Sequence, residues 1–450
     1  MRQESNVKEE KLLYIETFGC QMNVSDSEKI VALLKGVGYR HTHDSSLADL
    51  IILNTCSVRA KAEQKVYSRL GKFKGLKKRN RHLILGIGGC VAQQEGERLL
   101  AIVPYLDIVF GTHNLHMLPE MVRAAEQGER LAQTAFLTND KCLDLFPATD
   151  GDKGVSRFVT IMQGCDNFCS YCIVPHVRGR EISRRSAEII NEIQKIADKG
   201  VSEVTLLGQN VNSYGLKSPG EPDFAALLRR VAEIPGIERI RFTTSHPKDI
   251  SAQLIACFAE LPKLCGHIHL PAQAGSDTVL ARMNRGYTRR EYLEKISALQ
   301  AARPGIQITG DMIVGFPGES VEDFCQTLSL MEDVRYADLF SFIYSVRPET
   351  KAAEFSDDVS HREKQERLDQ LQFLQRAMTL ERNKSFVGTR QKVLAEGVSK
   401  RGDQLFGRTS GNRVVNFTGD SSLIGSIVEL TITRAFQNSL LGEREPAAGR

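Results

Sequence analysis

The sequence has no long apolar run. None of its 450 residues lies in a stretch approaching the roughly 18 consecutive apolar residues needed to cross a membrane. The segment from Met1 to Lys11 is polar and charged, so it also lacks the apolar core of a secretory signal. We therefore expect a cytoplasmic protein without a membrane partner. In that compartment clustered cysteines, among the ten present, are better explained as metal ligands than as disulfides.

The chain also lacks a strong excess of either charge. Its formal net charge is +4, with 41% hydrophobic and 25% charged residues, which is ordinary for a globular protein. The length predicts about three domains. The segment from Lys384 to Arg450 contains ten lysines and arginines but only six acidic residues. This excess of four positive charges equals the net charge of the whole chain. This favours a polyanionic partner, although a basic surface without a ligand would show the same charge.

Three cysteines lie close together in the run GCDNFCSYC, namely Cys165, Cys169 and Cys172. Three thiolates leave one position of a four-ligand metal site open. A structural zinc site or an electron-carrying ferredoxin cluster normally takes four protein ligands. The C-x3-C-x2-C spacing therefore predicts an iron–sulfur cluster whose open iron binds a substrate or cofactor.

A second set of cysteines follows strand-like runs. Between Leu12 and Gly111 four apolar runs alternate with helix-like stretches, which is an α/β pattern. The first three runs are followed by Cys20, Cys56 and Cys90. Because loops after parallel strands share one edge of a sheet, these cysteines are expected to meet and to offer a second three-thiolate site. The alternative is three buried cysteines that act as small hydrophobic residues.

The rest of the chain predicts two further domains. Six strand-like runs between Arg157 and Tyr344, separated by helix-like segments, indicate an incomplete barrel of βα units. A long charged helix over Ser360 to Phe386 leads to short β runs separated by glycine turns, typical of a small all-β barrel. The predicted boundaries are an N-terminal domain over 11–128, a linker over 129–156, a barrel over 157–382 and a C-terminal domain over 383–446.

The cysteine run, with Tyr171 before its last cysteine, resembles the signature of the radical S-adenosylmethionine enzymes. An ordered set of further segments resembles the methylthiotransferase family of these enzymes along nearly the whole chain. They are Phe18 to Asn23, Asn54 to Arg59, Gly88 to Cys90, Gly164 to Pro175, Arg178 to Glu181, Leu206 to Gly215, Ser245 to Pro247, His269 to Asp277, Asp311 to Glu319, Gln404 to Thr409 and Asn438 to Glu443. The resemblance implies an N-terminal open α/β sheet domain, a central partial (βα)6 radical S-adenosylmethionine barrel and a C-terminal RNA-binding TRAM barrel.

The family type most similar to this sequence acts on N6-isopentenyladenosine beside the anticodon of tRNA. It replaces the C2–H bond by C2–SCH3, which requires a radical because this C–H bond is too strong for acid–base catalysis. The resemblance implies two 4Fe-4S clusters, two S-adenosylmethionine molecules per turnover, the tRNA anticodon arm as substrate, an electron donor such as flavodoxin or ferredoxin, and a monomer. Alternatives are a methylthiotransferase for threonylcarbamoyladenosine or for a ribosomal-protein aspartate, or a non-catalytic RNA-binding protein stapled by zinc.

The resemblance also implies cofactor and RNA contacts. The loop after the second barrel strand stands where the superfamily has a Gly-Gly-Glu loop, but it contains no glutamate. Ordinary barrel packing is the alternative for most of these positions. The predicted S-adenosylmethionine contacts are Tyr171, Gly208, Gln209, Asn210, Gln273, Ser276, Ile313 and Gly315, and the predicted RNA contacts are Arg178, Arg180, Arg408 and Arg413.

Overall fold

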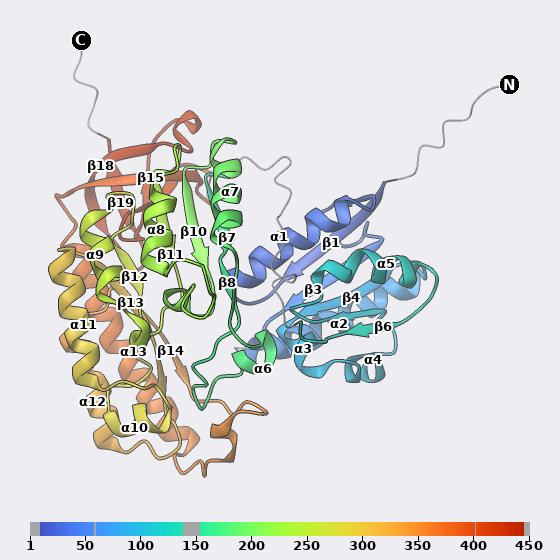
Figure 1. Ribbon diagram of the computed structural model, residues 1–450, viewed down its shortest axis with the longest axis horizontal. Coiled ribbons are helices and arrows are strands. Elements are labelled where there is room, and N and C mark those ends of the chain that lie inside the picture. Colours follow the sequence, from blue (N-terminus) through green and yellow to red (C-terminus); the bar gives the residue numbers. More distant parts are fainter. Residues whose placement is uncertain (1–9, 58–59, 138–153, 401, 445–450) are drawn as a thin grey trace. The chain divides into compact units, whose positions relative to one another are not determined.

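The computed structural model describes residues 10–57, 60–137, 154–400 and 402–444, in two compact units (Figure 1). The smaller unit comprises Met1–Gly151, Gln163–Asp166 and Ile173–Arg184. The larger unit comprises Asp152–Met162, Asn167–Cys172 and Arg185–Arg450. Much of the predicted linker, residues 138–153, lies outside the described residues.

The smaller unit contains a six-stranded parallel sheet of order β2-β1-β3-β4-β5-β6. Four strands match the predicted apolar runs. The edge strands β2 and β6 were not predicted, because three residues are too few to show a periodicity. The strands are β1 (Lys11–Thr17), β2 (Tyr39–His41), β3 (Leu50–Thr55), β4 (Ile84–Gly89), β5 (Ile108–Phe110) and β6 (Leu131–Gln133).

Helices cover both faces of this sheet. Leu50 and Ile52 of β3 pack in a core with α1 and α5, whereas Ile51 and Leu53 pack in a second core with α2 and α4. A strand that is buried on both faces has apolar residues at consecutive positions, as Leu50 to Leu53 of β3 do. The helices are α1 (Gln21–Lys35), α2 (Ala60–Arg79), α3 (Cys90–Glu95), α4 (Arg98–Ile102), η1 (Leu115–Met117), α5 (Leu118–Glu126) and, from the later segment, α6 (Val174–Arg178).

The larger unit contains two three-stranded parallel sheets of order β11-β10-β7 and β12-β13-β14. A parallel bridge between Ile240 of β11 and Leu264, just before β12, links them. Among the described strands, β7 does not pair with β14. The predicted barrel is therefore partial. Its strands are β7 (Ser156–Thr160), β10 (Glu203–Leu207), β11 (Arg239–Phe242), β12 (His267–His269), β13 (Gln307–Val314) and β14 (Asp338–Ile343). The short strands β8 (Met162–Gln163) and β9 (Ile182–Ser183) pair with each other in a separate two-stranded sheet.

Alternate residues of the barrel strands face the helices and form the main core, which includes Val204, Ile240 and Met312. The helices between the strands begin mostly at Ser, Thr or Asp residues, whose side chains cap the helical N–H groups of α8, α9, α11 and α12. The helices are α7 (Ser186–Ala197), α8 (Phe224–Ala232), α9 (Ala252–Glu260), α10 (Asp277–Arg282), α11 (Arg289–Ala302) and α12 (Val321–Val334), with short 3-10 turns η3 (Val211–Ser213), η4 (Pro247–Asp249) and η5 (Lys351–Glu354).

After the long helix α13 (His361–Lys384), the chain closes a five-stranded barrel of order β15-β16-β17-β19-β18. The last strand, β19, was not predicted as a strand. The bounds are β15 (Arg390–Val398), β16 (Leu405–Thr409), β17 (Val414–Phe417), β18 (Ile427–Ala435) and β19 (Leu440–Glu443), with η6 (Ser421–Leu423) before β18.

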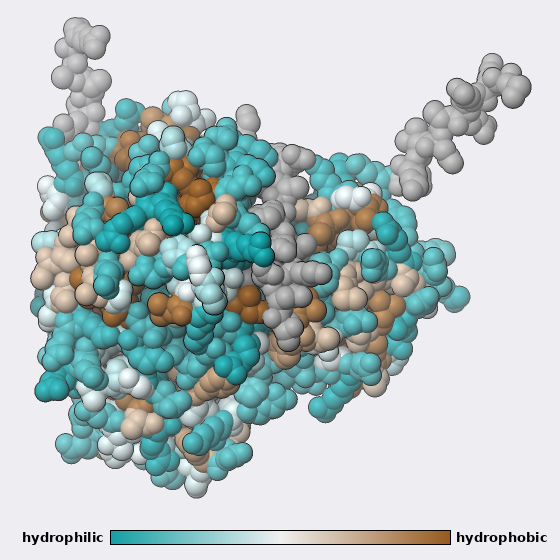
Figure 2. All heavy atoms as spheres, viewed as in Figure 1, coloured by the Kyte–Doolittle hydropathy of each residue, from teal (hydrophilic) through white to brown (hydrophobic). Residues whose placement is uncertain are grey.

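The surface visible in Figure 2 is mainly hydrophilic, with apolar residues in small separate groups. Within the described residues, no helix has the length and apolar character that crossing a membrane requires.

Candidate active site

The predicted radical-cluster cysteines lie in the chain between β8 and α6, directly after the first barrel strand. Cys169 and Cys172 belong to the larger unit, where the Cys172 N–H donates to the carbonyl of Cys169 (2.9 Å). Cys165 belongs to the smaller unit, where its N–H donates to the carbonyl of Gly179 (3.2 Å). The short spacing keeps all three cysteines in one loop.

The sulfur of Cys169 faces two nitrogen donors. Arg285 Nη1 lies 3.2 Å from Cys169 Sγ, and His246 Nε2 lies 3.9 Å from it. The Lys248 N–H donates to His246 Nδ1 (3.2 Å), so this ring nitrogen accepts and Nε2 carries the hydrogen. Burial, followed by the charges of Arg285 and Lys248, lowers the pKa of His246 to about 2. The imidazole is therefore a neutral donor.

Arg285 is held in place by several further contacts. Its Nε donates to the Tyr287 hydroxyl (3.1 Å) and its Nη2 to the carbonyl of Pro271 (2.8 Å). Nη1 also lies 3.4 Å from the Tyr171 hydroxyl. Two N–H groups directed at one cysteine suit a thiolate better than a neutral thiol, so the surroundings of Cys169 fit a cluster ligand.

The N-terminal cysteines follow three neighbouring strands. Cys20 caps α1 after β1, Cys56 follows β3, and Cys90 begins α3 after β4. Gly19 packs so closely that an added Cβ would lie 2.4 Å from the Cβ of Cys56. Burial raises the pKa of the Cys90 thiol, and Arg178 partly offsets this effect. The predicted meeting of the three cysteines at one sheet edge agrees with this topology.

In the part of the chain that the structure describes, no three Cys, His, Asp or Glu side chains are grouped so as to hold one metal ion. The three cysteine ligands of a 4Fe-4S cube each bind a different iron and lie farther apart than the ligands of a single ion. The described residues form no disulfide either. The assignment of each cysteine set to a 4Fe-4S cluster stays a prediction.

The predicted cofactor loop after β10 is tightly packed. A Cβ on Gly208 would lie 2.4 Å from Met162, which leaves no room for a side chain. Asn210 is buried, and its side chain donates to Asp249 Oδ2 (2.7 Å) and accepts from the His246 N–H (3.1 Å). Its amide therefore joins this loop to the loop after β11, while Gln209 is partly exposed.

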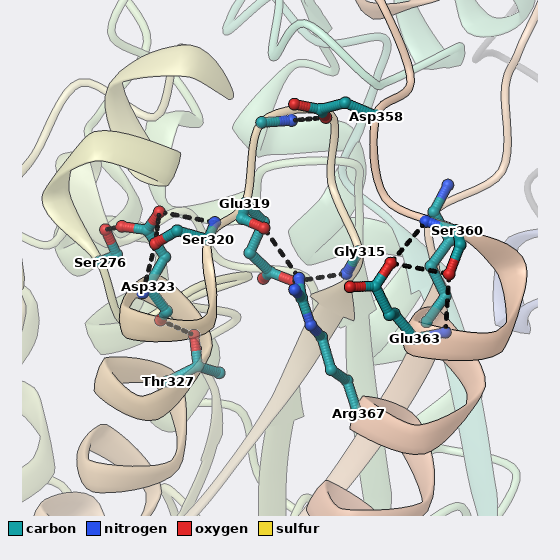
Figure 3. A network of polar contacts seen from close by, with 12 residues as sticks. Ser276, Gly315, Glu319, Ser320, Asp323, Thr327, Asp358, Ser360, Glu363 and Arg367 are labelled. Atoms are coloured by element: carbon teal, nitrogen blue, oxygen red, sulfur yellow. Dashed lines mark hydrogen bonds and ion pairs between the residues drawn. The ribbon is translucent and has the colours of Figure 1, made fainter.

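The predicted contacts on the opposite half of the barrel lie around β13. The backbone of Gln273, at φ +76°, pairs with Asp311 and Ile313. The hydroxyl of Ser276 donates to Asp323, and the Gly315 N–H donates to Glu319 Oε2 (2.6 Å), as Figure 3 shows. Ser276 and Gly315 therefore shape the loops, and their contacts with S-adenosylmethionine stay predictions.

Known protein families match each part of the chain. Residues 12–111 match "Uncharacterized protein family UPF0004", residues 159–331 the "Radical SAM superfamily", and residues 384–444 the "TRAM domain". The tRNA-2-methylthio-N(6)-dimethylallyladenosine synthase of Geobacter sulfurreducens is 73% identical over 97% of this chain and 98% of its own length. The chain belongs to this synthase family. The synthase of Geobacter metallireducens is 72% identical over 96% of this chain and 98% of its own length.

Solved structures share the fold at low identity. The radical S-adenosylmethionine methyltransferase TsrM from Kitasatospora setae, with cobalamin and a [4Fe-4S] cluster bound, has a TM-score of 0.58 at 14% identity, covering 85% of this chain and 80% of its own. The cobalamin-dependent enzyme OxsB has a TM-score of 0.52 at 14% identity, covering 81% of this chain and 56% of its own. The predicted family and fold class are confirmed. The chain is a radical S-adenosylmethionine enzyme.

The sequence did not point to the strand face opposite the barrel helices. In the parallel pairing of β13 and β14, Asp311 lies beside Phe340 and Ile313 beside Phe342. Phe340 and Phe342 are 52% and 36% exposed, and His269 of β12 contacts the Phe340 ring (6.3 Å). The spacing of Phe340 and Phe342, two residues apart in a strand-like run, is a sequence signal that could have identified this face.

Three of the predicted RNA contacts bind oxygen atoms of the protein. Arg413 is 8% exposed and donates to the carbonyl of Ala337, and Arg408 pairs with Glu396 (2.6 Å). Arg178 is buried in an ion pair with Asp26. Arg178 and Arg413 are thus buried against protein oxygens, whereas the Arg408 side chain is 28% exposed, and the RNA contacts of all three stay predictions.

The fourth predicted RNA contact, Arg180, has an exposed side chain that pairs with Asp166.

Proposed function

We propose that this protein is a tRNA methylthiotransferase that converts N6-isopentenyladenosine beside the anticodon into its 2-methylthio derivative. The observation that carries the proposal is identity of about three residues in four to the tRNA-2-methylthio-N(6)-dimethylallyladenosine synthase of Geobacter sulfurreducens over nearly the full length of both chains. Both cysteine triads stand at positions that suit cluster ligands.

The proposal assigns one 4Fe-4S cluster to each triad. When bound, the clusters and S-adenosylmethionine supply the radical that removes hydrogen from C2 and the sulfur and methyl group that replace it. An external electron donor such as flavodoxin or ferredoxin completes the proposal, because the described side chains offer no low-potential reductant.

The chain's own residues hold and orient these groups. Arg285 and His246 donate to Cys169 and so fix the ligand sulfur. The tight loop at Gly208 and the Gly315 turn bring backbone close to the site. The exposed rings of Phe340 and Phe342, beside the predicted cofactor segment at Ile313, suit an adenine that carries an apolar isopentenyl group better than one that carries a charged threonylcarbamoyl group.

The proposal is tested by mass spectrometry of anticodon stem-loops after incubation with anaerobically reconstituted protein, S-adenosylmethionine and a reductant. The parent should form the 2-methylthio product on isopentenyladenosine RNA and none on threonylcarbamoyladenosine RNA. The triple change Cys165→Ala, Cys169→Ala, Cys172→Ala should lose about four irons per chain and all 5′-deoxyadenosine formation.

The triple change Cys20→Ala, Cys56→Ala, Cys90→Ala should keep 5′-deoxyadenosine formation but form no methylthio product. Cys325→Ala is the matched control, because Cys325 is exposed on α12, and it should behave like the parent. Methylthiolation by the Cys20, Cys56, Cys90 variant would refute the two-cluster proposal.

A further inference from the structure

The side chain of Arg178, at the end of α6, is fixed in the interior of the smaller unit. It is 3% exposed, and its Nη2 donates to Asp26 Oδ2 on α1 (2.8 Å). The backbone of the same turn is held as well. Thr112 Oγ1 donates to the carbonyl of Val177 (2.7 Å), and His113 Nε2 lies 2.9 Å from the carbonyl of Arg178. Because both ends are anchored, the guanidinium has a defined position.

The guanidinium lies beside the N-terminal cysteines. Cys90 packs against Ile173 and Val177 in one small apolar cluster, which brings α6 to Cys90. Burial by itself lowers the pKa of Arg178, but Asp26, Cys90 and Cys20 outweigh it, so the pKa of Arg178 is raised above its ordinary value. Two of the three groups that stabilise this cation are thus predicted cluster ligands.

Among the described residues, Nη1 of this guanidinium has no oxygen or nitrogen acceptor, although the guanidinium also interacts with the Cys90 thiol. Nη1 of Arg178 is also buried. A buried N–H group without an acceptor is unfavourable, and native proteins rarely keep one unless a ligand completes it. Asp26 occupies Nη2, so Nη1 is the donor that remains for a ligand beside Cys20 and Cys90.

We propose that Arg178 Nη1 donates a hydrogen bond to a small anionic sulfur ligand, of the hydrosulfide or persulfide class, bound at the open position of the cluster held by Cys20, Cys56 and Cys90. The inference rests on the proposed function, which places a cluster there. Arginine suits this task because it stays charged when buried and its fork binds Asp26 and a second anion at once. Arg178 is then a positioning residue for sulfur, not an RNA contact.

The test uses the full chain carrying Cys165→Ala, Cys169→Ala and Cys172→Ala, so that only the N-terminal cluster remains. The reconstituted, reduced protein is titrated with sodium hydrosulfide and followed by electron paramagnetic resonance. Arg178→Gln should retain about four irons per chain and bind hydrosulfide about 10- to 100-fold more weakly, the loss expected for one charge-assisted hydrogen bond. Arg98→Gln is the control, since Arg98 is 75% exposed in the same unit.

Each outcome decides the question. Parental hydrosulfide affinity in Arg178→Gln overturns the inference. If Arg178→Gln loses iron, the titration is repeated with Arg178→Lys. Lysine keeps the positive charge but lacks the two-nitrogen fork of the guanidinium. Retained iron with weakened hydrosulfide binding supports the inference. Loss of iron from both variants, or parental affinity in Arg178→Lys, overturns it. A parent without iron would instead refute the proposed N-terminal cluster.

Discussion

At the scale of single residues, the surroundings of Cys169 show how the chain prepares a ligand sulfur. The neutral His246 and the cationic Arg285 both direct an N–H group at the same Sγ atom. Arg285 is itself fixed by Tyr287 and by the carbonyl of Pro271. Hydrogen bonds to ligand sulfurs and nearby positive charge stabilise the more negative, reduced form of a cluster.

Replacing Arg285 should therefore change the reduction potential of the cluster at Cys169. In a chain carrying Cys20→Ala, Cys56→Ala and Cys90→Ala, Arg285→Gln should make this potential more negative by an amount on the order of tens of millivolts. Arg285→Lys, which keeps the charge, should shift it less. The measurement is a redox titration monitored by electron paramagnetic resonance. Arg290→Gln, an exposed residue of α11, is the control. A potential unchanged in Arg285→Gln would contradict the role given to the N–H···S contact.

At the scale of elements, the loop from β13 to α12 is fixed by two carboxylates (Figure 3). Glu319 accepts from the Gly315 N–H and pairs with Arg367 of α13 (2.7 Å). Asp323 closes a capping box with Ser320 at the start of α12 and also accepts from the hydroxyl of Ser276. One carboxylate thus caps a helix and joins it to α10, which keeps the predicted cofactor segments in register.

Asp323→Ala should lower the free energy of unfolding by about 2 kcal/mol, because it removes a helix cap and leaves the Ser276 hydroxyl unpaired. Burial acts to raise the pKa of Asp323, but hydrogen bonds from Ser276 and Ser320 outweigh this effect, and the pKa lies below the ordinary value of 3.8 for an aspartate. The contribution is therefore present above this value and lost as the pH falls through the folded-state pKa.

Chemical unfolding of the metal-free chain across this pH range measures the effect. The difference between the parent and Asp323→Ala should shrink as the pH falls below the ordinary pKa of the carboxyl group. Glu322→Ala, an exposed acidic residue in the same helical turn, should change stability little. A pH-independent difference would mean that the ionised carboxylate is not the stabilising form.

At the scale of the whole larger unit, a buried charge network joins the C-terminal barrel to the radical S-adenosylmethionine barrel. Glu203, fully buried at the start of β10, pairs with Arg241 (2.9 Å) and with Arg408 (3.4 Å). Arg241 also donates to the carbonyl of Thr409 (2.7 Å), and Arg239 to that of Arg408 (2.6 Å). The C-terminal barrel therefore docks at the end of the strands opposite the cysteine loop.

Arg408→Ala should consequently destabilise this docking, by on the order of 3 kcal/mol, because it leaves part of the Glu203 charge uncompensated. Thermal unfolding should show a lower midpoint, while the salt dependence of tRNA binding stays as in the parent. Arg434→Ala removes a positive charge from an exposed site of the same barrel and is the stability control. If Arg408→Ala flattens the salt dependence by about one unit without loss of stability, Arg408 contacts a phosphate after all.

The sequence by itself determined the features that depend on short spacing. The C-x3-C-x2-C run, the cysteines after three apolar runs and the order of the three domains were all readable, since ligand spacing and strand periodicity are local properties. The three-residue edge strands β2 and β6 could not be predicted, because pairing with a neighbouring strand, rather than amino-acid composition, makes these segments strands.

Only the tertiary structure decided what individual polar side chains do. Arg178 and Asp26 are 152 residues apart in the chain, and Arg408 and Glu203 are 205 apart. A surface arginine that binds phosphate and a buried arginine that pairs with a carboxylate look alike in a sequence. The fold decides between these two roles, because the charge of a buried guanidinium requires a partner. Packing between distant segments determines which carboxylate that partner is.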